Sequence, residues 1–330
     1  MHGLEGRSLF MQESPTLMQR ALGAYLGLAA GDALGATVEF MTAREIAAIF
    51  KVHRHMVGGG WLRLKVGQVT DDTEMALALG EALLRGGVND TRVIADSYVK
   101  WMQSCPVDIG NTCRRGIRRY MLQGTIAAEP APDSAGNGAA MRNLPVILAT
   151  LDDEISFERL TLEQAHITHN HPLSDAAVLT VGRMTRRLLR GEGMQAARAE
   201  MILLVEVIPD FKFDPWPGNT SGYIVDTVQT VMDALFTTNS FESCLLKAVN
   251  RGGDADTTGA LAGQLAGALY GIDSIPQIWL NKLDRQIQEA VRGQTAGLLA
   301  IHTREPAAEV SHRENAATPF SMPAPKPSPT

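Results

Sequence analysis

Two short acidic segments, far apart in the chain, contain the residues best suited to chemistry. One reads Thr70-Asp-Asp-Thr-Glu and the other Gly253-Asp-Ala-Asp-Thr-Thr, and each leads into an apolar run of small residues. Together they offer carboxylate and hydroxyl oxygens from Thr70, Asp71, Asp72, Asp254, Asp256 and Thr257. Such oxygen ligands suit Mg²⁺ or Mn²⁺ and not zinc or copper. If the two segments meet in the fold, we expect them to hold a pair of divalent cations.

Helix capping is the alternative explanation for both segments. Asp and Thr ahead of an apolar run often cap a helix N-terminus, and acids in a first turn interact favourably with the helix dipole. Capping needs only one such side chain per helix, whereas each segment carries several, including the adjacent Asp71 and Asp72. Like charges at this density repel one another unless a cation offsets them. We therefore favour the metal-binding interpretation.

Asp108 and a glycine-containing loop are further candidates for substrate contacts. Asp108 precedes Gly110 and Asn111 on a predicted turn into a helix, where it can act as an acid or base or form an Asx-turn. The loop 134–141 contains Gly136-Asn-Gly138. Such a loop can direct backbone N–H groups at a phosphate, although most Gly-Asn-Gly tripeptides are simple turns.

Three histidines and one tyrosine complete the candidate residues. His166, His169 and His171 cluster ahead of Pro172, but zinc is disfavoured because no cysteine and no second histidine cluster accompany them. A hydrogen bond from one of these histidines to a substrate fits better, and a structural role is the alternative. Tyr223 ends a proline-rich loop, where its ring can stack on a base or anchor the loop.

Glycine recurs at every fourth position in two stretches that adjoin acidic residues. The two ladders are Gly23, Gly27, Gly31 and Gly35, and Gly259, Gly263, Gly267 and Gly271. Residues i and i+4 share a helix face, so each ladder removes the side chains from one face. Glycine weakens a helix by about 1 kcal/mol per residue, so close packing must offset this loss. We expect two central helices that deliver Asp32, Glu39 and the second acidic segment to one site.

The composition indicates a helical, cytosolic protein. The chain has 330 residues, of which 45% are hydrophobic, and a net charge of −6 that disfavours a broad nucleic-acid surface. Its three cysteines lack metal or redox spacing, which is typical of reduced thiols. The glycine-rich stretch 21–38 contains Asp32 and predicts a buried helix of a soluble protein, not a membrane span, and residues 1–14 lack the apolar region of a signal peptide.

Apolar residues three and four apart predict an all-α fold, a compact multi-helix bundle. The helical periodicity covers residues 74–84, 93–102, 162–169, 174–189, 194–207, 224–235, 241–250, 258–270 and 278–299. We expect one domain over residues 15–302, with a flexible tail at 1–14 and a disordered tail rich in proline and alanine at 303–330. Four arginines on one predicted helix form a solvated face or meet an acidic partner: Arg114, Arg115, Arg118 and Arg119.

At these motifs the chain resembles the ADP-ribosylglycohydrolase family. The matching stretches are residues 31–40, 58–64, 70–75, 107–120, 135–142, 167–175, 223–227 and 252–263. They occur in the family's order within residues 18–295. The stretch with Asp108 and Arg118-Arg119 points to the branch of the family that acts in nitrogen fixation. The proline-rich C-terminal end lies outside the family pattern.

The resemblance implies an all-α fold with a binuclear Mn²⁺ or Mg²⁺ centre. It implies Thr70, Asp71 and Asp72 as ligands of one ion and Asp254 and Thr257 as ligands of the other, with Asp256 shared. It places an ADP-ribose site among Glu39, Asp108, Asn111, His169 and Tyr223, with Gly136, Asn137 and Gly138 at the diphosphate. Asp108 would act on the ribose and leaving group while Glu39 helps to activate water, and the two roles could be exchanged.

The implied activity is the removal of ADP-ribose from an arginine of dinitrogenase reductase, the nitrogenase iron protein, which reactivates it. Action on another ADP-ribosylated protein or small molecule and a non-catalytic binding role are alternatives. A two-metal phosphohydrolase fits poorly because the expected histidine ligands are absent. The resemblance also implies a cytoplasmic protein that a partner can recruit reversibly to the membrane, and a PII signalling protein as regulator. No nucleic-acid partner or integral membrane segment is expected.

Overall fold

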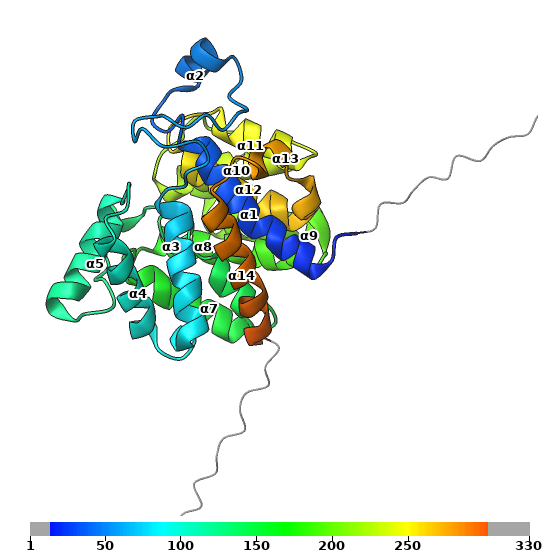
Figure 1. Ribbon diagram of the computed structural model, residues 1–330. Coiled ribbons are helices and arrows are strands. Elements are labelled where there is room, and N and C mark those ends of the chain that lie inside the picture. The colour runs from blue at the N-terminus through cyan, green and yellow to red at the C-terminus, as the bar shows by residue number, and fades with distance from the viewer. Residues whose placement is uncertain (1–13, 303–330) are drawn as a thin grey trace, which may run out of the picture.

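The structure is a computed structural model that describes residues 14–302. Within that range, every regular secondary-structure element is a helix. In the first half of the chain they are α1 (Leu17–Gly35), α2 (Ala43–Phe50), α3 (Asp71–Ala82), α4 (Thr91–Gln103), α5 (Asn111–Gln123), α6 (Leu144–Ala149) and α7 (Glu154–His166). The others are α8 (Pro172–Leu189), α9 (Gly193–Val207), α10 (Ile224–Phe236), α11 (Phe241–Val249), α12 (Ala255–Tyr270), α13 (Gln277–Leu280) and α14 (Arg285–His302). Short segments named η1 (Leu83–Gly87), η2 (Pro132–Ser134), η3 (Pro209–Phe211) and η4 (Ile272–Ser274) extend or join them. The predicted all-α fold is confirmed (Figure 1).

Helices α1 and α12 pack against each other along the two glycine ladders at the centre of the molecule (Figure 1). A Cβ atom placed on Gly27 would lie 2.3 Å from the carbonyl oxygen of Gly263, and one placed on Gly263 would lie 2.0 Å from that of Gly27. Gly23 meets Gly267 in the same way, and Gly31 meets Gly259, so the helices run antiparallel. The two backbones are therefore in direct contact, as the ladders predict.

The antiparallel contact brings the second acidic segment to the end of α1. A Cβ on Gly35 would lie 2.1 Å from the carbonyl oxygen of Ala255, the first residue of α12. Asp254 and Asp256 flank that residue, while Glu39 follows the end of α1 after a short turn. The same glycine packing that joins the two helices thus places these carboxylates side by side.

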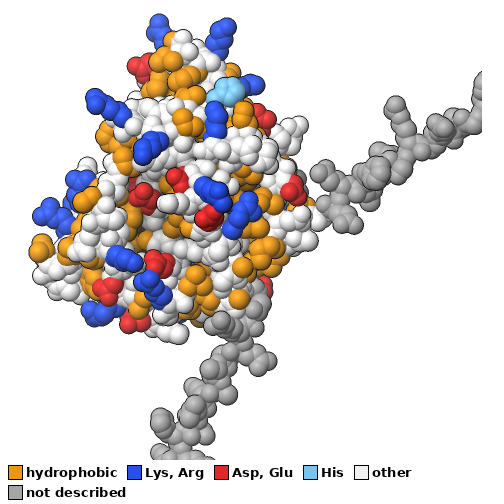
Figure 2. Space-filling view, viewed as in Figure 1, with side chains coloured by type: hydrophobic (Ala, Val, Ile, Leu, Met, Phe, Trp, Pro, Cys, Tyr) orange, Lys and Arg blue, Asp and Glu red, His pale blue; other side chains and the backbone are white. Residues whose placement is uncertain are grey.

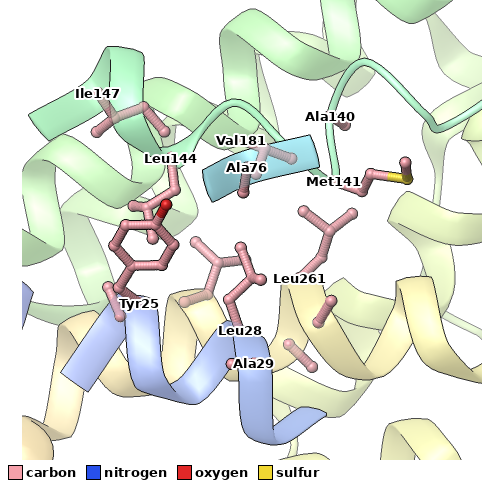
Figure 3. Packing of buried hydrophobic residues seen from close by; sticks show 14 of the residues in the cluster. Tyr25, Leu28, Ala29, Ala76, Ala140, Met141, Leu144, Ile147, Val181 and Leu261 are labelled. Atoms are coloured by element: carbon pink, nitrogen blue, oxygen red, sulfur yellow. The ribbon is translucent and has the colours of Figure 1, made fainter. Parts of the chain in front are cut away.

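Apolar side chains from the neighbouring helices surround this central pair. Figure 3 shows Leu28 and Ala29 of α1 and Leu261 of α12 facing Ala76 of α3 and Leu144 of α6. All of these side chains are buried. The core fixes α3 against α1, and α3 begins at the first acidic segment. Among residues 14–302, no helix has the length and apolar character needed to cross a membrane.

Several helix boundaries differ from those predicted. The single helix predicted at 278–299 is α13 and α14, because the Asp284 side chain accepts hydrogen bonds from the backbone N–H groups of Gln286 and Ile287 and starts a new helix. The helix predicted to begin at residue 162 starts at Glu154, where the Asp153 side chain caps it. Helix α2, which stands apart from the rest in Figure 1, has no counterpart in the predicted helices.

The two predicted tails fall almost entirely outside the described residues. Residues 1–13 and 303–330 are not described, and only Ser14 of the predicted N-terminal tail lies within the structure. The flexible character of residues 1–14, the disorder of 303–330 and the single domain at 15–302 stay predictions.

The close contact of α1 and α12 predicts that a single methyl group destabilises the fold. Gly263→Ala should lower the free energy of unfolding by about 1–3 kcal/mol, the usual effect of overpacking, because the new methyl group would meet backbone atoms. Gly293→Ala in α14 is the matched control, since a Cβ there meets no group within 4 Å. It should raise stability by about 0.5–1 kcal/mol. Urea denaturation measures both, and wild-type stability in Gly263→Ala would contradict the contact.

Candidate active site and metal centre

A cavity of about 450 Å³ opens where α3, α5 and α12 begin, next to the end of α1. Most of the residues predicted to form the site line it, namely Glu39, Asp71, Asp108, Asn111, Gly136, Asn137, Gly138, His169, Asp254, Asp256 and Thr257. Thr70 and Asp72 are buried next to the cavity, in contact with its acidic residues. Tyr223 does not line it, although the preceding Gly222 does. The structure therefore brings the two acidic segments, the Asp108 turn and the glycine loop to one place.

The carboxylates form a compact cluster at one side of the cavity. Glu39, Asp254 and Asp256 each have an oxygen atom within 4.8 Å of the others. The Thr70 hydroxyl lies 3.5 Å from a carboxylate oxygen of Asp72 and 3.5 Å from one of Asp256. These distances join the first acidic segment to the second, as a shared metal site requires.

Burial and mutual repulsion disfavour the charged form of Glu39, Asp71, Asp72 and Asp256. Burial, with the charge of Asp108 next in size, raises the pKa of Asp71 to about 7. The pKa of Glu39 rises to about 8, mainly through burial and against a hydrogen bond from Trp61. Burial and neighbouring carboxylates hold the pKa values of Asp72 and Asp256 well above the usual range. The protein thus concentrates acidic groups where water cannot stabilise their charge.

The groups around the cluster fit a divalent cation. Among the described residues, none of the ion pairs with Lys, Arg or His involves Glu39, Asp71, Asp72, Asp254 or Asp256. The Oδ1 atom of Asp72 is also buried without a hydrogen-bond partner in this part of the chain. Buried charges require pairing or a metal ion, and carboxylate and hydroxyl oxygens are hard ligands. The acidic cluster can therefore hold a metal.

Asp32 positions the first acidic segment through hydrogen bonds. Its carboxylate accepts hydrogen bonds from the backbone N–H groups of Thr70 and Thr73 at 3.0 and 3.1 Å. Both hydroxyl groups donate to it as well, at 2.9 and 2.5 Å. Asp32 is fully buried on α1, so it anchors the start of α3 to the central helix pair. The glycine ladder predicted Asp32 near the site but not this supporting role.

The turn that carries Asp108 is tied to the acidic cluster. The backbone N–H of Gly110 donates to the Asp71 carboxylate at 3.1 Å. The Asp108 carboxylate accepts from the backbone N–H of Ile109 at 2.8 Å, and burial raises the pKa of Asp108. Asn111 begins α5 directly after this turn. Asp108 is thus a cavity-lining acid outside the metal cluster, held close to it through the backbone.

His169 is a neutral hydrogen-bond donor that faces the glycine loop. Its Nδ1 atom lies 2.7 Å from the Thr168 hydroxyl, which accepts a hydrogen bond of 2.8 Å from Arg142. The Thr168 hydroxyl can accept from Arg142 and donate to Nδ1 at the same time, and in that arrangement the ring proton of His169 lies on Nε2. Burial, aided by the charge of Arg142, lowers the pKa of His169 to about 3. A Cβ on Gly136 would lie 3.0 Å from Nε2, which places this N–H beside the loop.

The other two histidines of the cluster have structural contacts. His166 lies 3.0 Å from the Asp175 carboxylate, and the His171 ring accepts the backbone N–H of Leu173 as the cap of α8. His169 is the member of the three that lines the cavity. The three rings thus contact different groups, namely the Asp175 carboxylate, the Thr168 hydroxyl and the backbone N–H of Leu173.

The glycine loop packs tightly between His169 and the second acidic segment. A Cβ on Gly138 would lie 2.7 Å from the His169 ring, so a side chain at this position would displace the imidazole. The Asn137 side-chain amide donates to the Asp254 carboxylate at 2.5 Å. The Tyr223 side chain is 41% exposed and lies outside the cavity wall, so its stacking on a base stays a prediction.

Several residues at the site were missed by sequence reasoning. Phe40 and Trp61 line the cavity with their ring centroids 5.4 Å apart, and the Trp61 indole donates to Glu39 at 2.6 Å. Arg142 is fully buried and acts on His169 through Thr168. The sequence feature that could have pointed to Arg142 is that it is a single charged residue in the otherwise mainly apolar stretch leading into α6.

Comparison with known proteins gives consistent matches over most of the chain. Residues 13–308 match the family model ADP-ribosylglycohydrolase. The ADP-ribosyl-[dinitrogen reductase] glycohydrolase of Rhodospirillum rubrum is 58% identical over 87% of this chain and 98% of that protein. The ADP-ribosylarginine hydrolase Tri1 of Serratia proteamaculans (strain 568) is 33% identical over 82% of this chain and 76% of that protein. A solved structure described as an ADP-ribosylglycohydrolase-related protein complex superimposes with a TM-score of 0.76 at 34% identity, covering 87% of this chain and 99% of that one.

The raised pKa values predict an unusual pH dependence for the metal-free protein. The folded-state pKa values of Asp71 and Glu39, about 7 and about 8, lie above unfolded values of about 4. Between these unfolded and folded pKa values, the folded state therefore binds more protons than the unfolded state. The stability that this proton binding contributes decreases with rising pH and is lost once the pH has passed through 7 to 8. Urea denaturation of EDTA-treated protein should show a smaller free energy of unfolding at pH 8 than at pH 5.5.

Asp71→Asn is the control, because the substitution removes one of the titrating groups. The loss of stability between the two pH values should be smaller in this variant than in the wild type. Excess Mn²⁺ should weaken or reverse the trend for the wild type, since a cation stabilises the ionised carboxylates. A wild-type loss no larger than that of Asp71→Asn would contradict the raised pKa of Asp71.

Proposed function

Since the chain belongs to the ADP-ribosylglycohydrolase family, we propose that this hydrolase removes ADP-ribose from an arginine of dinitrogenase reductase and so reactivates it. The main support is the 58% identity to a relative whose name specifies dinitrogen reductase, over 98% of that relative. The arginine linkage draws support from the ADP-ribosylarginine hydrolase at 33% identity. The reaction adds water across the bond between ribose C1 and a guanidinium nitrogen.

The proposed cofactor is a pair of divalent cations, Mn²⁺ or Mg²⁺. Thr70, Asp71 and Asp72 would hold one ion, Asp254 and Thr257 the other, with Asp256 between them. When bound, the cations supply Lewis acidity and a fixed position for the attacking water. The shortage of basic partners and the unpartnered Asp72 oxygen support this assignment.

Asp108 and Glu39 are proposed as the groups that move protons. Asp108 is held on a turn at the cavity wall, and its raised pKa favours keeping a proton for the departing guanidine nitrogen. Glu39 lies in the acidic cluster, with one oxygen already hydrogen-bonded to Trp61. Bound cations would lower its pKa from the metal-free value of about 8, and the ionised carboxylate would accept a proton from the attacking water. These two assignments could be exchanged without a change in the overall reaction.

His169 and the glycine loop are proposed to receive the diphosphate. An anionic diphosphate needs donors that offset the neighbouring carboxylates, and the neutral His169 offers an Nε2–H toward the loop. Because the pKa of His169 is about 3, this donor keeps the same protonation state across the physiological pH range. Asn111 lines the same cavity and would bind the ribose, while Tyr223 would stack on the base from outside the wall.

Regulation by a PII signalling protein and reversible recruitment to the membrane remain proposals supported by the resemblance. The structure narrows which arginines can meet a partner. Arg119 is not free as the sequence suggested, because it donates to the backbone carbonyls of Ile126 and Ile167. Arg115 pairs with Asp133. Arg114 and Arg118 are exposed and take part in no ion pair among the described residues.

The direct test is incubation of the protein with ADP-ribosylated dinitrogenase reductase and Mn²⁺. Mass measurement should show the loss of one ADP-ribosyl group from the substrate and the release of free ADP-ribose. EDTA should abolish the reaction, and added Mn²⁺ should restore it. Cleavage of ADP-ribosylarginine without cleavage of dinitrogenase reductase would retain the enzyme class and reject the protein substrate.

Asp108→Asn should lower kcat by roughly 100-fold or more, because the amide cannot transfer a proton. The variant should retain its metal content, since Asp108 lies outside the acidic cluster. Asp133→Asn is the matched control, because Asp133 is an exposed acid paired with Arg115. Steady-state kinetics and metal analysis measure both variants, and a near-normal kcat in Asp108→Asn would leave Asp108 with only a turn-forming role.

A further inference from the structure

A second hollow lies beside the mouth of the catalytic cavity, between α4 and α5. It encloses about 470 Å³ and its walls are mainly apolar, with Met102, Pro106, Ile109, Met121 and Leu122 among them. Leu122 is 78% exposed. Arg114 and Arg118 supply positive charge along the same wall. We call this hollow the α4–α5 groove.

The α4–α5 groove adjoins the catalytic cavity. Ile109 and Arg114 line both. Ile109 directly follows Asp108, which lines the catalytic cavity, so the groove begins next to the turn that carries Asp108. On the face shown in Figure 2, hydrophobic and basic side chains adjoin one another along the left edge, at the α4–α5 end of the molecule in Figure 1.

The charge in the groove is available to a partner. Arg114 and Arg118 are one helical turn apart on α5, and neither forms an ion pair among the described residues. Arg114 donates to the Ile109 carbonyl and its charge acts on Asp108, so Arg118 is the more available of the two. The chain as a whole carries a net charge of −6, so this positive patch runs against its overall charge. An apolar hollow with unpaired arginines at its wall fits an acidic surface that also presents apolar side chains.

We propose that the α4–α5 groove is a docking site for the protein part of the substrate, an acidic and partly apolar surface beside the ADP-ribosylated arginine. The inference rests on the proposed function, which requires the modified side chain to enter the cavity while its protein stays outside. The protein surface next to that side chain must then lie against the cavity mouth. The groove adjoins the mouth on the Asp108 side, where the bond to the guanidinium would be cleaved.

Arg118→Glu and Leu122→Ser test the proposal, since both residues line the groove and not the catalytic cavity. The kcat/KM of each variant is measured on ADP-ribosylated dinitrogenase reductase and on ADP-ribosylarginine. Arg118→Glu should lower kcat/KM on the protein about tenfold through KM, the equivalent of about 1.4 kcal/mol. It should leave kcat/KM on ADP-ribosylarginine within twofold of the wild type, and the defect should shrink at high salt. Leu122→Ser should lower kcat/KM on the protein several-fold without the salt dependence.

Matched controls are Arg292→Glu and Leu203→Ser, which change exposed residues on α14 and α9. Both should behave as the wild type on both substrates. An equal loss on both substrates, or no loss on the protein, would overturn the docking site. A dimer that the groove variants abolish, with kcat/KM on the protein intact, would assign the groove to self-association and also overturn it. Failure of the wild type to cleave either substrate would instead reject the proposed function.

Discussion

The contact between the backbones of α1 and α12 is the constraint on which the rest of the structure depends. Four glycines of α1, spaced four residues apart, let its backbone meet that of α12 without an intervening side chain of α1. Each glycine weakens its own helix, so this arrangement is stable only as a packed pair. The antiparallel pairing fixes where α12 starts relative to the end of α1. The positions of Glu39, Asp254 and Asp256 follow from that alignment.

Close backbone packing also explains how the protein tolerates so many buried acids. Asp32 on α1 takes up the donors at the start of α3, which leaves the carboxylates of Asp71 and Asp72 without those partners. Neighbouring carboxylates raise the pKa values of Asp71 and Asp72, burial being the larger cause. Rigid helices hold these groups together despite their repulsion. The folded protein therefore holds carboxyl groups that favour protonation without a metal and that a divalent cation can stabilise in their charged form.

The features that repeat or concentrate in the sequence were the predictable ones. The glycine ladders predicted a close helix pair, and the density of acids predicted that the two segments share a site; the structure places both as expected. The boundary between α13 and α14 was not predictable from apolar periodicity, because a single side chain, Asp284, starts the second helix. The contacts of Arg119 were not predictable either, because its guanidinium donates to the backbone carbonyls of Ile126 and Ile167 in other segments.

The hydrogen bonds that link one side chain to the next could not be predicted from the sequence, for a related reason. The chain of contacts from Arg142 through Thr168 to His169 depends on how α6 and α7 face each other across the core. No spacing along the chain encodes that orientation. The same holds for Trp61, which reaches Glu39 from a separate loop. The residues of the cavity could thus be predicted in large part, whereas their tautomers, partners and supports required the fold.

The hydrogen bond from Trp61 to Glu39 gives the acidic cluster an optical consequence. The indole is 53% exposed at the cavity and donates directly to a carboxylate of the cluster. Indole emission responds to charge and hydration close to the ring, so ionisation of Glu39 or the arrival of a cation changes the environment of this fluorophore. The other three tryptophans lie elsewhere, with Trp279 buried against the Arg54 carbonyl, Trp101 bonded to Glu74 and Trp216 under Arg251. The protein therefore carries a built-in fluorescent reporter at the cavity proposed as its active site.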